Sequence, residues 1–294
     1  RRHDVVRLHA VTRTWSLACL CALLCACSEP ANETEDAESA ARVVTLAPNL
    51  AELVFAVGAG DQLVGVSAWS DYPRAVLELP EVGDAFMVDQ EQLAFLNPDL
   101  VLVWKSGTPQ HTVDELRKRG YRVETVRTRG LGDVGAALRR VGELTGRQQR
   151  ADEVAKKFAA GLQSLRDNYA DQPPIDVFYQ VSARPLYTVN REHYVSGLIK
   201  ICGGRNIFDD LDDLAPAISA EAVIDRDPEV MLASTDAGDD AFAEWDRWPS
   251  LAAIRYGNQF LLPADEIGRA TPRLLIAGNA MCLALSQARV NRSL

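Results

Sequence analysis

The longest helical pattern in the chain lies near its middle and constrains the fold most. In residues 147–170, RQQRADEVAKKFAAGLQSLRDNYA, apolar side chains recur every three or four positions, so a helix would carry them on one face. Pro173 and Pro174 end the pattern, because proline lacks the N–H that a helix needs. The sequence on either side alternates short apolar runs with helical periods, which indicates α/β structure. We therefore predict two α/β lobes joined by one long helix.

The two halves divide into short elements with recognisable ends. In the first half, Asn49 is expected to cap a helix, with Glu52 three residues later completing a capping box and Gly58 ending the helix. The expected strands cover 43–46, 63–67, 100–104, 122–126 and 177–181, and further helices 113–119 and 131–144. The expected domains are a first lobe at 42–146, an inter-lobe helix at 147–172 and a second lobe at 173–290.

One pattern occurs in both halves. Residues 91–102, EQLAFLNPDLVL, align without a gap on residues 221–232, EAVIDRDPEVML. Each segment predicts a short helix, a turn of proline and an acid, and an apolar strand, with a glutamate seven residues before the proline. Such joints are common, so chance is the alternative, but the matched glutamates favour an old duplication of one lobe. Two similar lobes would enclose a ligand between them.

The first 27 residues are typical of a secretory signal peptide. Four arginines precede an apolar run at 15–26, which is too short to span a bilayer, since about 20 residues are needed. The run ends in Leu24-Cys25-Ala26-Cys27, similar to a bacterial lipobox, so we expect Cys27 to be lipidated, with simple cleavage as the alternative. The polar, acidic segment 28–41 would then be a flexible tether.

Four of the six cysteines lie within residues 19–27 and could instead form a zinc or iron–sulfur site. The spacers between them are apolar, so no polar neighbour is present to orient the thiolates. The signal peptide is therefore the favoured interpretation, and no metal site is predicted.

Charge and motifs exclude two broad classes of function. Without the signal peptide, 27 basic and 40 acidic residues remain, which is the opposite of what a nucleic-acid partner requires. None of the sequence motifs of serine hydrolases, zinc peptidases or P-loop proteins is present. His111 and His193 lie outside the leader and are interpreted as surface residues. We therefore expect no catalytic activity.

Several stretches between Arg42 and Arg289 resemble one family when taken together. They are RVVTLAPNLAEL, SDYP, LNPDLVLVW, CGGRNIF, SAEAV with DPEV, and GRATPR. They are similar to the helical-backbone substrate-binding proteins of ABC importers, and within that family to its cobalamin-binding members. The resemblance implies the class III periplasmic-binding-protein fold, with two Rossmann-like α/β lobes and a long rigid helix. It also implies a periplasmic monomer with no cofactor of its own, which carries cobalamin, or alternatively a ferric siderophore or haem.

The resemblance assigns roles to two residue pairs. Glu91 and Glu221 match the glutamates, one on each lobe, that dock this family onto a permease dimer with its ATPase. The alternative is that both are ordinary solvated residues of helices. Cys202 and Cys282 match the positions of a disulfide, which suits an oxidising compartment. The alternative is a pair of buried free thiols.

The ligand contacts implied by the resemblance come from both lobes. They are Pro48, Asn49, Tyr72 and Trp104 in the first lobe, and Tyr187, Asp265 and Arg269 in the second. The chain departs from the cobalamin binders at Ala85 and Ala215, where those proteins carry tryptophan, and at Glu266-Ile267-Gly268, where theirs is more aromatic. Phe86, Trp69 or Tyr194 are candidates to fill that space, and His193, Tyr187 or Tyr194 to ligate a haem iron.

Overall fold

The computed structural model describes residues 39–293, which pack as one compact unit. The predicted signal peptide, Cys27 and residues 28–38 of the predicted tether lie outside the described residues. Ala40 is already buried, and its N–H donates to the carbonyl of Leu144 at 2.9 Å. The predicted tether 28–41 therefore meets packed structure at Ala40. Within residues 39–293, no helix is both long enough and apolar enough to cross a membrane.

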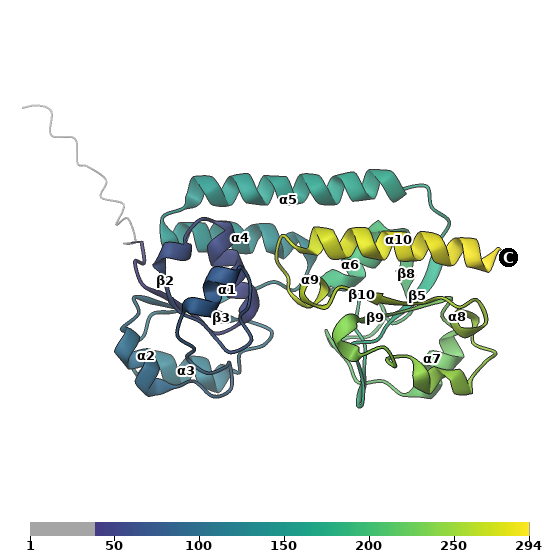
Figure 1. Cartoon of the computed structure of the whole chain (residues 1–294), viewed down its shortest axis with the longest axis horizontal. Coiled ribbons are helices and arrows are strands. Elements are labelled where there is room, and N and C mark those ends of the chain that lie inside the picture. The colour runs from purple at the N-terminus through teal and green to yellow at the C-terminus, as the bar shows by residue number, and fades with distance from the viewer. Residues whose placement is uncertain (1–38, 294) are drawn as a thin grey trace, which may run out of the picture. The chain divides into compact units, whose positions relative to one another are not determined.

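Two parallel four-stranded sheets form the centre of the fold (Figure 1). The central strands of each sheet are short, mostly apolar and largely buried, as expected for parallel sheets covered by helices on both faces. The first sheet has the order β2-β1-β3-β4 and the second the order β8-β5-β9-β10, so the two orders correspond. The strands are β1 (Val43–Thr45), β2 (Leu63–Gly65), β3 (Leu100–Trp104), β4 (Val123–Val126), β5 (Ile175–Tyr179), β8 (Gly204–Asn206), β9 (Val230–Ser234) and β10 (Gln259–Leu262), with β6 (Ser182–Ala183) and β7 (Leu186–Tyr187) as a separate antiparallel pair.

Helices connect and cover both sheets. We call the first sheet with α1–α4 the first lobe, and the second sheet with α6–α10 the second lobe. The helices are α1 (Pro48–Ala56), α2 (Gln90–Leu96), α3 (Gln110–Lys118), α4 (Leu131–Thr145), α5 (Gln148–Tyr169), α6 (Tyr194–Ile201), α7 (Ala220–Arg226), α8 (Ala252–Arg255), α9 (Ala264–Gly268) and α10 (Leu274–Arg292).

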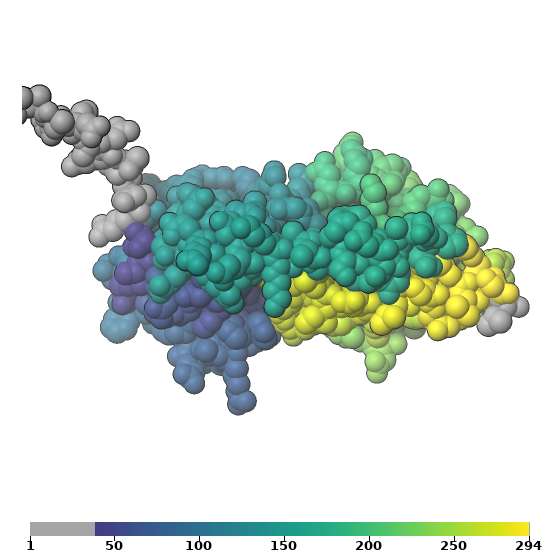
Figure 2. Space-filling model, turned by 90° about the horizontal axis from the view of Figure 1, so that it is seen from above, coloured from purple at the N-terminus to yellow at the C-terminus, as the bar shows by residue number. Residues whose placement is uncertain are grey.

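The long helix α5 runs across both lobes, with α10 beside it over the second lobe (Figures 1 and 2). Its buried face contains Ala151, Ala155, Phe158, Leu162 and Leu165, all part of the predicted stripe. These side chains belong to one core cluster that continues into α1 and α4 in the first lobe and α6 and α10 in the second. The predicted fold of two α/β lobes joined by a long helix is confirmed, and the lobes share one hydrophobic core.

The structure repeats the pattern seen in the sequence. Helices α2 and α7 have seven residues each and end in left-handed residues, Asn97 (φ 42°) and Asp227 (φ 40°), before a proline and a buried strand. The acid after each proline also has the same role. Asp99 accepts a hydrogen bond from the Arg42 N–H at 2.9 Å, and Glu229 accepts one from the Asp176 N–H at 3.0 Å. This equivalence supports the duplication inferred from the sequence.

The predicted start of α1 is wrong. The helix begins at Pro48, after an N-cap at Ala47 that has no capping side chain, and Asn49 lies inside the first turn. Proline is well suited to the first helical position, because its φ is preset and its missing N–H is not needed there. Glu52 is consequently not part of a capping box, and its carboxylate instead reaches the second lobe.

Candidate ligand-binding site

The carboxyl edge of the first sheet holds three of the predicted ligand contacts. Pro48 and Asn49 open α1 shortly after β1, and Trp104 ends the neighbouring parallel strand β3. The Trp104 ring is fixed at its edge, since its Nε1 donates to Thr128 Oγ1 at 2.9 Å. In open α/β sheets this edge is where ligands usually bind.

A cluster of charged side chains joins the two lobes, and we call it the inter-lobe cluster. Its centre is Glu52 of α1, only 3% exposed, whose Oε1 accepts from Arg269 Nη1 and Arg273 Nη1, each at 3.0 Å. Glu52 Oε2 accepts from Thr271 Oγ1 at 2.8 Å. Arg269 caps the C-terminus of α9 and Arg273 precedes α10, so a short segment of the second lobe supplies all three partners.

Arg269 extends the inter-lobe cluster toward solvent. Its guanidinium pairs with Asp71, donates to the Trp69 carbonyl at 3.3 Å and lies 3.5 Å from Asp265. Burial lowers the pKa of Arg269, but the hydrogen bonds to Asp71 and Glu52 outweigh it and raise that pKa above the ordinary value. The hydrogen bond from Arg269 in turn lowers the pKa of Asp71. Both groups are therefore charged at neutral pH.

Tyr72 is brought to the same place by a different contact. The Arg273 guanidinium stacks over the Tyr72 ring, 4.1 Å from its centre. A cavity of about 310 Å³ opens beside this pair. Its wall combines apolar and charged side chains and consists of Glu52, Phe55, Ala56, Tyr72, Pro73, Thr271, Pro272 and Arg273. The structure thus gathers Tyr72, Asp265 and Arg269 around one inter-lobe cluster.

Tyr187 lies in a different neighbourhood. It belongs to β7, faces Ser182 across the β6–β7 pair and forms an isolated bridge with Ala217. Among residues 39–293, the contacts found for Tyr187 do not include the inter-lobe cluster. Its role as a ligand contact stays a prediction.

Trp69 is the most exposed of the three aromatic residues that could replace the missing tryptophans. Its side chain is 81% exposed, and its backbone has φ 67°, a conformation rarely adopted by large side chains. Arg269 holds its carbonyl at the junction of the lobes. The sequence gives no signal for the strained backbone, so Trp69 was only one of three candidates for the missing aromatic surface.

The other two candidates for that surface differ from each other. Phe86 is 69% exposed on a turn that the Asp84 carboxylate holds by accepting from the N–H groups of Phe86 and Met87, each at 2.7 Å. Tyr194 is buried, and this burial raises the pKa of its hydroxyl. Phe86 can therefore meet a ligand in the described structure, whereas Tyr194 cannot.

His193 was interpreted as a surface residue, but the structure encloses much of its ring. It caps α6, its Nδ1 accepting from the Val195 N–H at 3.3 Å, and it stacks on Tyr194 with ring centres 4.2 Å apart. Burial, with the nearby charge of Arg129 adding to it, lowers the pKa of His193 to about 4. Within residues 39–293, no group of three or more histidine, cysteine, aspartate or glutamate side chains could hold a metal ion.

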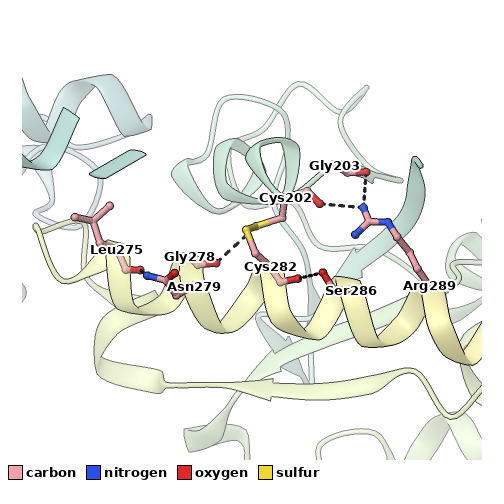
Figure 3. Close-up of a disulfide and its surroundings, with 8 residues drawn as sticks. All are labelled: Cys202, Gly203, Leu275, Gly278, Asn279, Cys282, Ser286 and Arg289. Atoms are coloured by element: carbon pink, nitrogen blue, oxygen red, sulfur yellow. Dashed lines mark hydrogen bonds between the residues drawn. A yellow bond between two sulfur atoms is a disulfide. The ribbon is translucent and has the colours of Figure 1, made fainter. Parts of the chain in front are cut away.

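The predicted disulfide between Cys202 and Cys282 is confirmed (Figure 3). It ties the C-terminal end of α6 to the middle of α10. Arg289, two helical turns after Cys282 in α10, donates to the carbonyls of Cys202 at 2.9 Å and Gly203 at 3.0 Å. The bond therefore fixes the packing of α6 against α10 within the second lobe.

Glu91 and Glu221 occupy equivalent, exposed positions on the two lobes. Each is the second residue of its helix, α2 or α7. Asp89 and Ser219 cap these helices by accepting from backbone N–H groups of the first turn. Hydrogen bonds from its own N–H and from Ser219 lower the pKa of Glu221. Both lobes thus present a carboxylate on a short, well-capped helix.

The architecture is that of a two-lobed solute-binding protein. It has two parallel sheets covered by helices, a core shared by both lobes, and charged and aromatic side chains where the lobes meet. Residues 43–266 match the family described as "Periplasmic binding protein", and the chain belongs to that family. It is 34% identical over 251 residues to the vitamin B12-binding protein of Vibrio cholerae, covering 85% of this chain and 91% of the relative. It is 33% identical to that of Yersinia pestis, covering 85% and 88%.

Solved structures give the same picture. The crystal structure of the periplasmic vitamin B12-binding protein BtuF of Vibrio cholerae superposes with a TM-score of 0.76 at 33% identity, covering 85% of this chain and 98% of that one. The heme-binding protein BhuT, at 24% identity and a TM-score of 0.74 over 85% and 99% of the two chains, shares the fold.

Proposed function

We propose that this chain captures cobalamin, or a related corrinoid, between its lobes and delivers it to the permease of an ABC importer. The observation that carries the proposal is the similarity to vitamin B12-binding proteins over 85% of the chain, by sequence and by structure. The role is that of a carrier without chemistry of its own. Because α5 and the shared core connect the lobes, we expect only a small closing movement on binding.

The exposed groups at the junction suit such a ligand. A corrin ring has broad apolar faces, for which the exposed Trp69 and Tyr72 rings offer flat surface. We add Phe86, which is exposed on the turn after Gly83, whose carbonyl accepts from the Ala68 N–H at 2.7 Å. Its amide arms need hydrogen-bond partners, and the carboxylates of Asp71 and Asp265 lie on either side of Arg269. We assign these residues to the ligand, together with Trp104 and the backbone of Pro48 and Asn49 at the sheet edge, where the Asn49 side chain is buried, and Tyr187 on its hairpin.

Two further parts of the proposal concern the membrane. Glu91 and Glu221 would pair with cationic side chains on the two permease subunits, because one carboxylate per lobe sets the orientation of docking. Residues 1–27 would direct export to the periplasm, and Cys27 would carry the lipid anchor, with residues after it as the tether.

Calorimetric titration of residues 28–294 with cyanocobalamin tests the ligand. We expect a dissociation constant of micromolar or tighter with one site per chain. Ferric siderophores and haem, followed by calorimetry and visible absorption, are the competitors. Binding of only these iron compounds would replace cobalamin by another ligand of the family, and turnover of any of them would contradict the carrier role.

A matched pair of arginine variants tests the site. Arg269→Met should weaken cyanocobalamin binding about tenfold or more, because it removes the central cation of the inter-lobe cluster. Arg226→Met removes an arginine that pairs with Asp210 elsewhere in the second lobe and should leave binding unchanged. Equal affinities of the two variants would contradict the assigned site.

A further inference from the structure

Glu52 is a buried carboxylate whose partners all belong to the other lobe. Both of its oxygens accept hydrogen bonds, from two arginines and one threonine between residues 269 and 273. A charge this deeply buried is tolerated only when it is paired and hydrogen-bonded, as this one is. Since Glu52 lies on α1, it ties that helix directly to the segment joining α9 and α10.

Each of the two arginines that bind Glu52 also contacts the loop 69–72, which carries the exposed rings of Trp69 and Tyr72. Arg269 contacts Asp71 and the Trp69 carbonyl, and Arg273 stacks on the Tyr72 ring. The geometry of the loop 69–72 therefore depends on two guanidinium groups, both of which are oriented by one carboxylate. Glu52 borders the cavity beside Tyr72, but it is only 3% exposed and both of its oxygens are already hydrogen-bonded, so it acts through the two arginines.

The inter-lobe cluster also has an excess of negative charge. Glu52, Asp71, Asp265 and Glu266 bring four carboxylates to the two arginines. The side chains of Asp71 and Asp265 are about half exposed, at 48% and 54%, whereas those of the arginines are only 14% and 16% exposed. A ligand at this junction therefore meets carboxylate acceptors rather than free cations, which disfavours anionic ligands.

We propose that Glu52 is the positioning and specificity-determining residue of this junction. It orients Arg269 and Arg273, so that they hold the loop 69–72, and it adds to the negative charge around them, so that the junction selects an uncharged, amide-bearing ligand over an anionic one. The identification of the ligand rests on the proposed function, but the control of the loop does not.

Glu52→Gln tests both parts. The amide is nearly isosteric but uncharged, so the arginines lose a partner while the packing of α1 is preserved. We expect the dissociation constant for cyanocobalamin to rise about tenfold or more. For ferric haem, whose two propionates are anionic, affinity should stay the same or rise. A residue with a merely structural role would weaken both ligands by the same factor, and that result would overturn the proposal.

A measurement without ligand decides the positioning part. Hydrogen–deuterium exchange of the segment 67–79 should be faster in Glu52→Gln than in the unaltered chain. Arg273→Met, which removes the stacking on Tyr72, should give the same local increase and serves if Glu52→Gln does not fold. Unchanged exchange in this segment in the folded variants would overturn the positioning role.

Glu229→Gln is the matched control. Glu229 is a partly buried, ion-paired carboxylate of the second lobe, bonded to Arg292 and to the Asp176 N–H. Its replacement is expected to leave exchange in 67–79 and the preference between the two ligands unaltered. If the unaltered chain binds no cobalamin, the proposed function fails, and the exchange measurement still decides whether Glu52 holds the loop.

Discussion

At the scale of single residues, the most unusual position is Trp69. A non-glycine residue at positive φ costs on the order of 1–3 kcal/mol and persists only when its surroundings enforce it. Here the enforcing contact comes from the other lobe, through the hydrogen bond between Arg269 and the Trp69 carbonyl. A strained backbone that presents an 81% exposed ring is best explained by a contact outside the chain.

Trp69→Ala should therefore affect binding and not stability. We expect cyanocobalamin affinity to fall by about 10- to 100-fold, because an aromatic platform is lost, while the melting temperature stays nearly constant. Phe95→Ala is the control, since Phe95 is 83% exposed on α2 and makes no part of the junction. Calorimetry and thermal unfolding of both variants check this, and a normal affinity of Trp69→Ala would exclude the ring from the site.

The lowered pKa of the buried His193 predicts how the free energy of unfolding depends on pH. Its pKa is about 4 in the folded chain and about 6.5 when unfolded, so only the unfolded chain takes up the proton as pH falls below 6.5. The stabilising effect is thus complete above pH 6.5 and is lost toward pH 4, by about 3 kcal/mol at most.

Urea unfolding at pH 7, 5.5 and 4 measures this effect. His193→Asn keeps a side chain able to cap α6 and should flatten the pH dependence. His111→Asn, on the exposed start of α3, is the control for losing a histidine. Identical pH profiles for His193→Asn and the unaltered chain would contradict the prediction.

Among the helices and strands, the sequence was most informative about those whose position is determined by residues close together in the chain. The stripe of α5, the strand at Leu100–Trp104 and the two helix–proline–strand joints were all predictable, because periodicity and proline determine them. The inter-lobe cluster was not, since Glu52 and Arg273 are 221 residues apart and only folding brings them together. Because Glu52 lies three residues after Asn49, the sequence predicts a capping box there. It gives no indication that Glu52 binds Arg273 of the second lobe.

The disulfide links two elements, α6 and α10, and its contribution can be calculated from the loop that it closes. The cysteines are 80 residues apart, which on the chain-entropy argument corresponds to about 4.5 kcal/mol of stability. Cys202→Ala combined with Cys282→Ala should lower the free energy of unfolding by roughly this amount in urea titrations. A reductant should destabilise the unaltered chain similarly and leave the double variant unaffected. If the double variant unfolds at the same urea concentration as the unaltered chain, this account of the disulfide is wrong.

At the scale of the whole molecule, the shared core matters because it fixes the relation between the lobes. Buried residues of α1, α5, α6 and α10 belong to one cluster, so the lobes cannot separate without exposing that core. The equivalent helices α2 and α7, one on each lobe, are therefore expected to keep a nearly constant separation. A rigid pair of carboxylates can engage a two-fold permease at two points simultaneously, and the second contact then benefits from a high effective concentration.

This rigidity predicts how the docking variants combine. Glu91→Ala or Glu221→Ala alone should weaken binding to the cognate permease–ATPase complex about tenfold, and the two together should abolish docking and uptake, because each contact supports the other. Cyanocobalamin affinity should be unchanged in all three. Glu153→Ala, an exposed carboxylate on α5, is the control. Binding to the complex in nanodiscs and uptake in cells provide the measurements. Uptake that survives the double change would refute the docking role, since the other matched pair of acids, Asp99 and Glu229, already accepts hydrogen bonds from backbone N–H groups within the lobes.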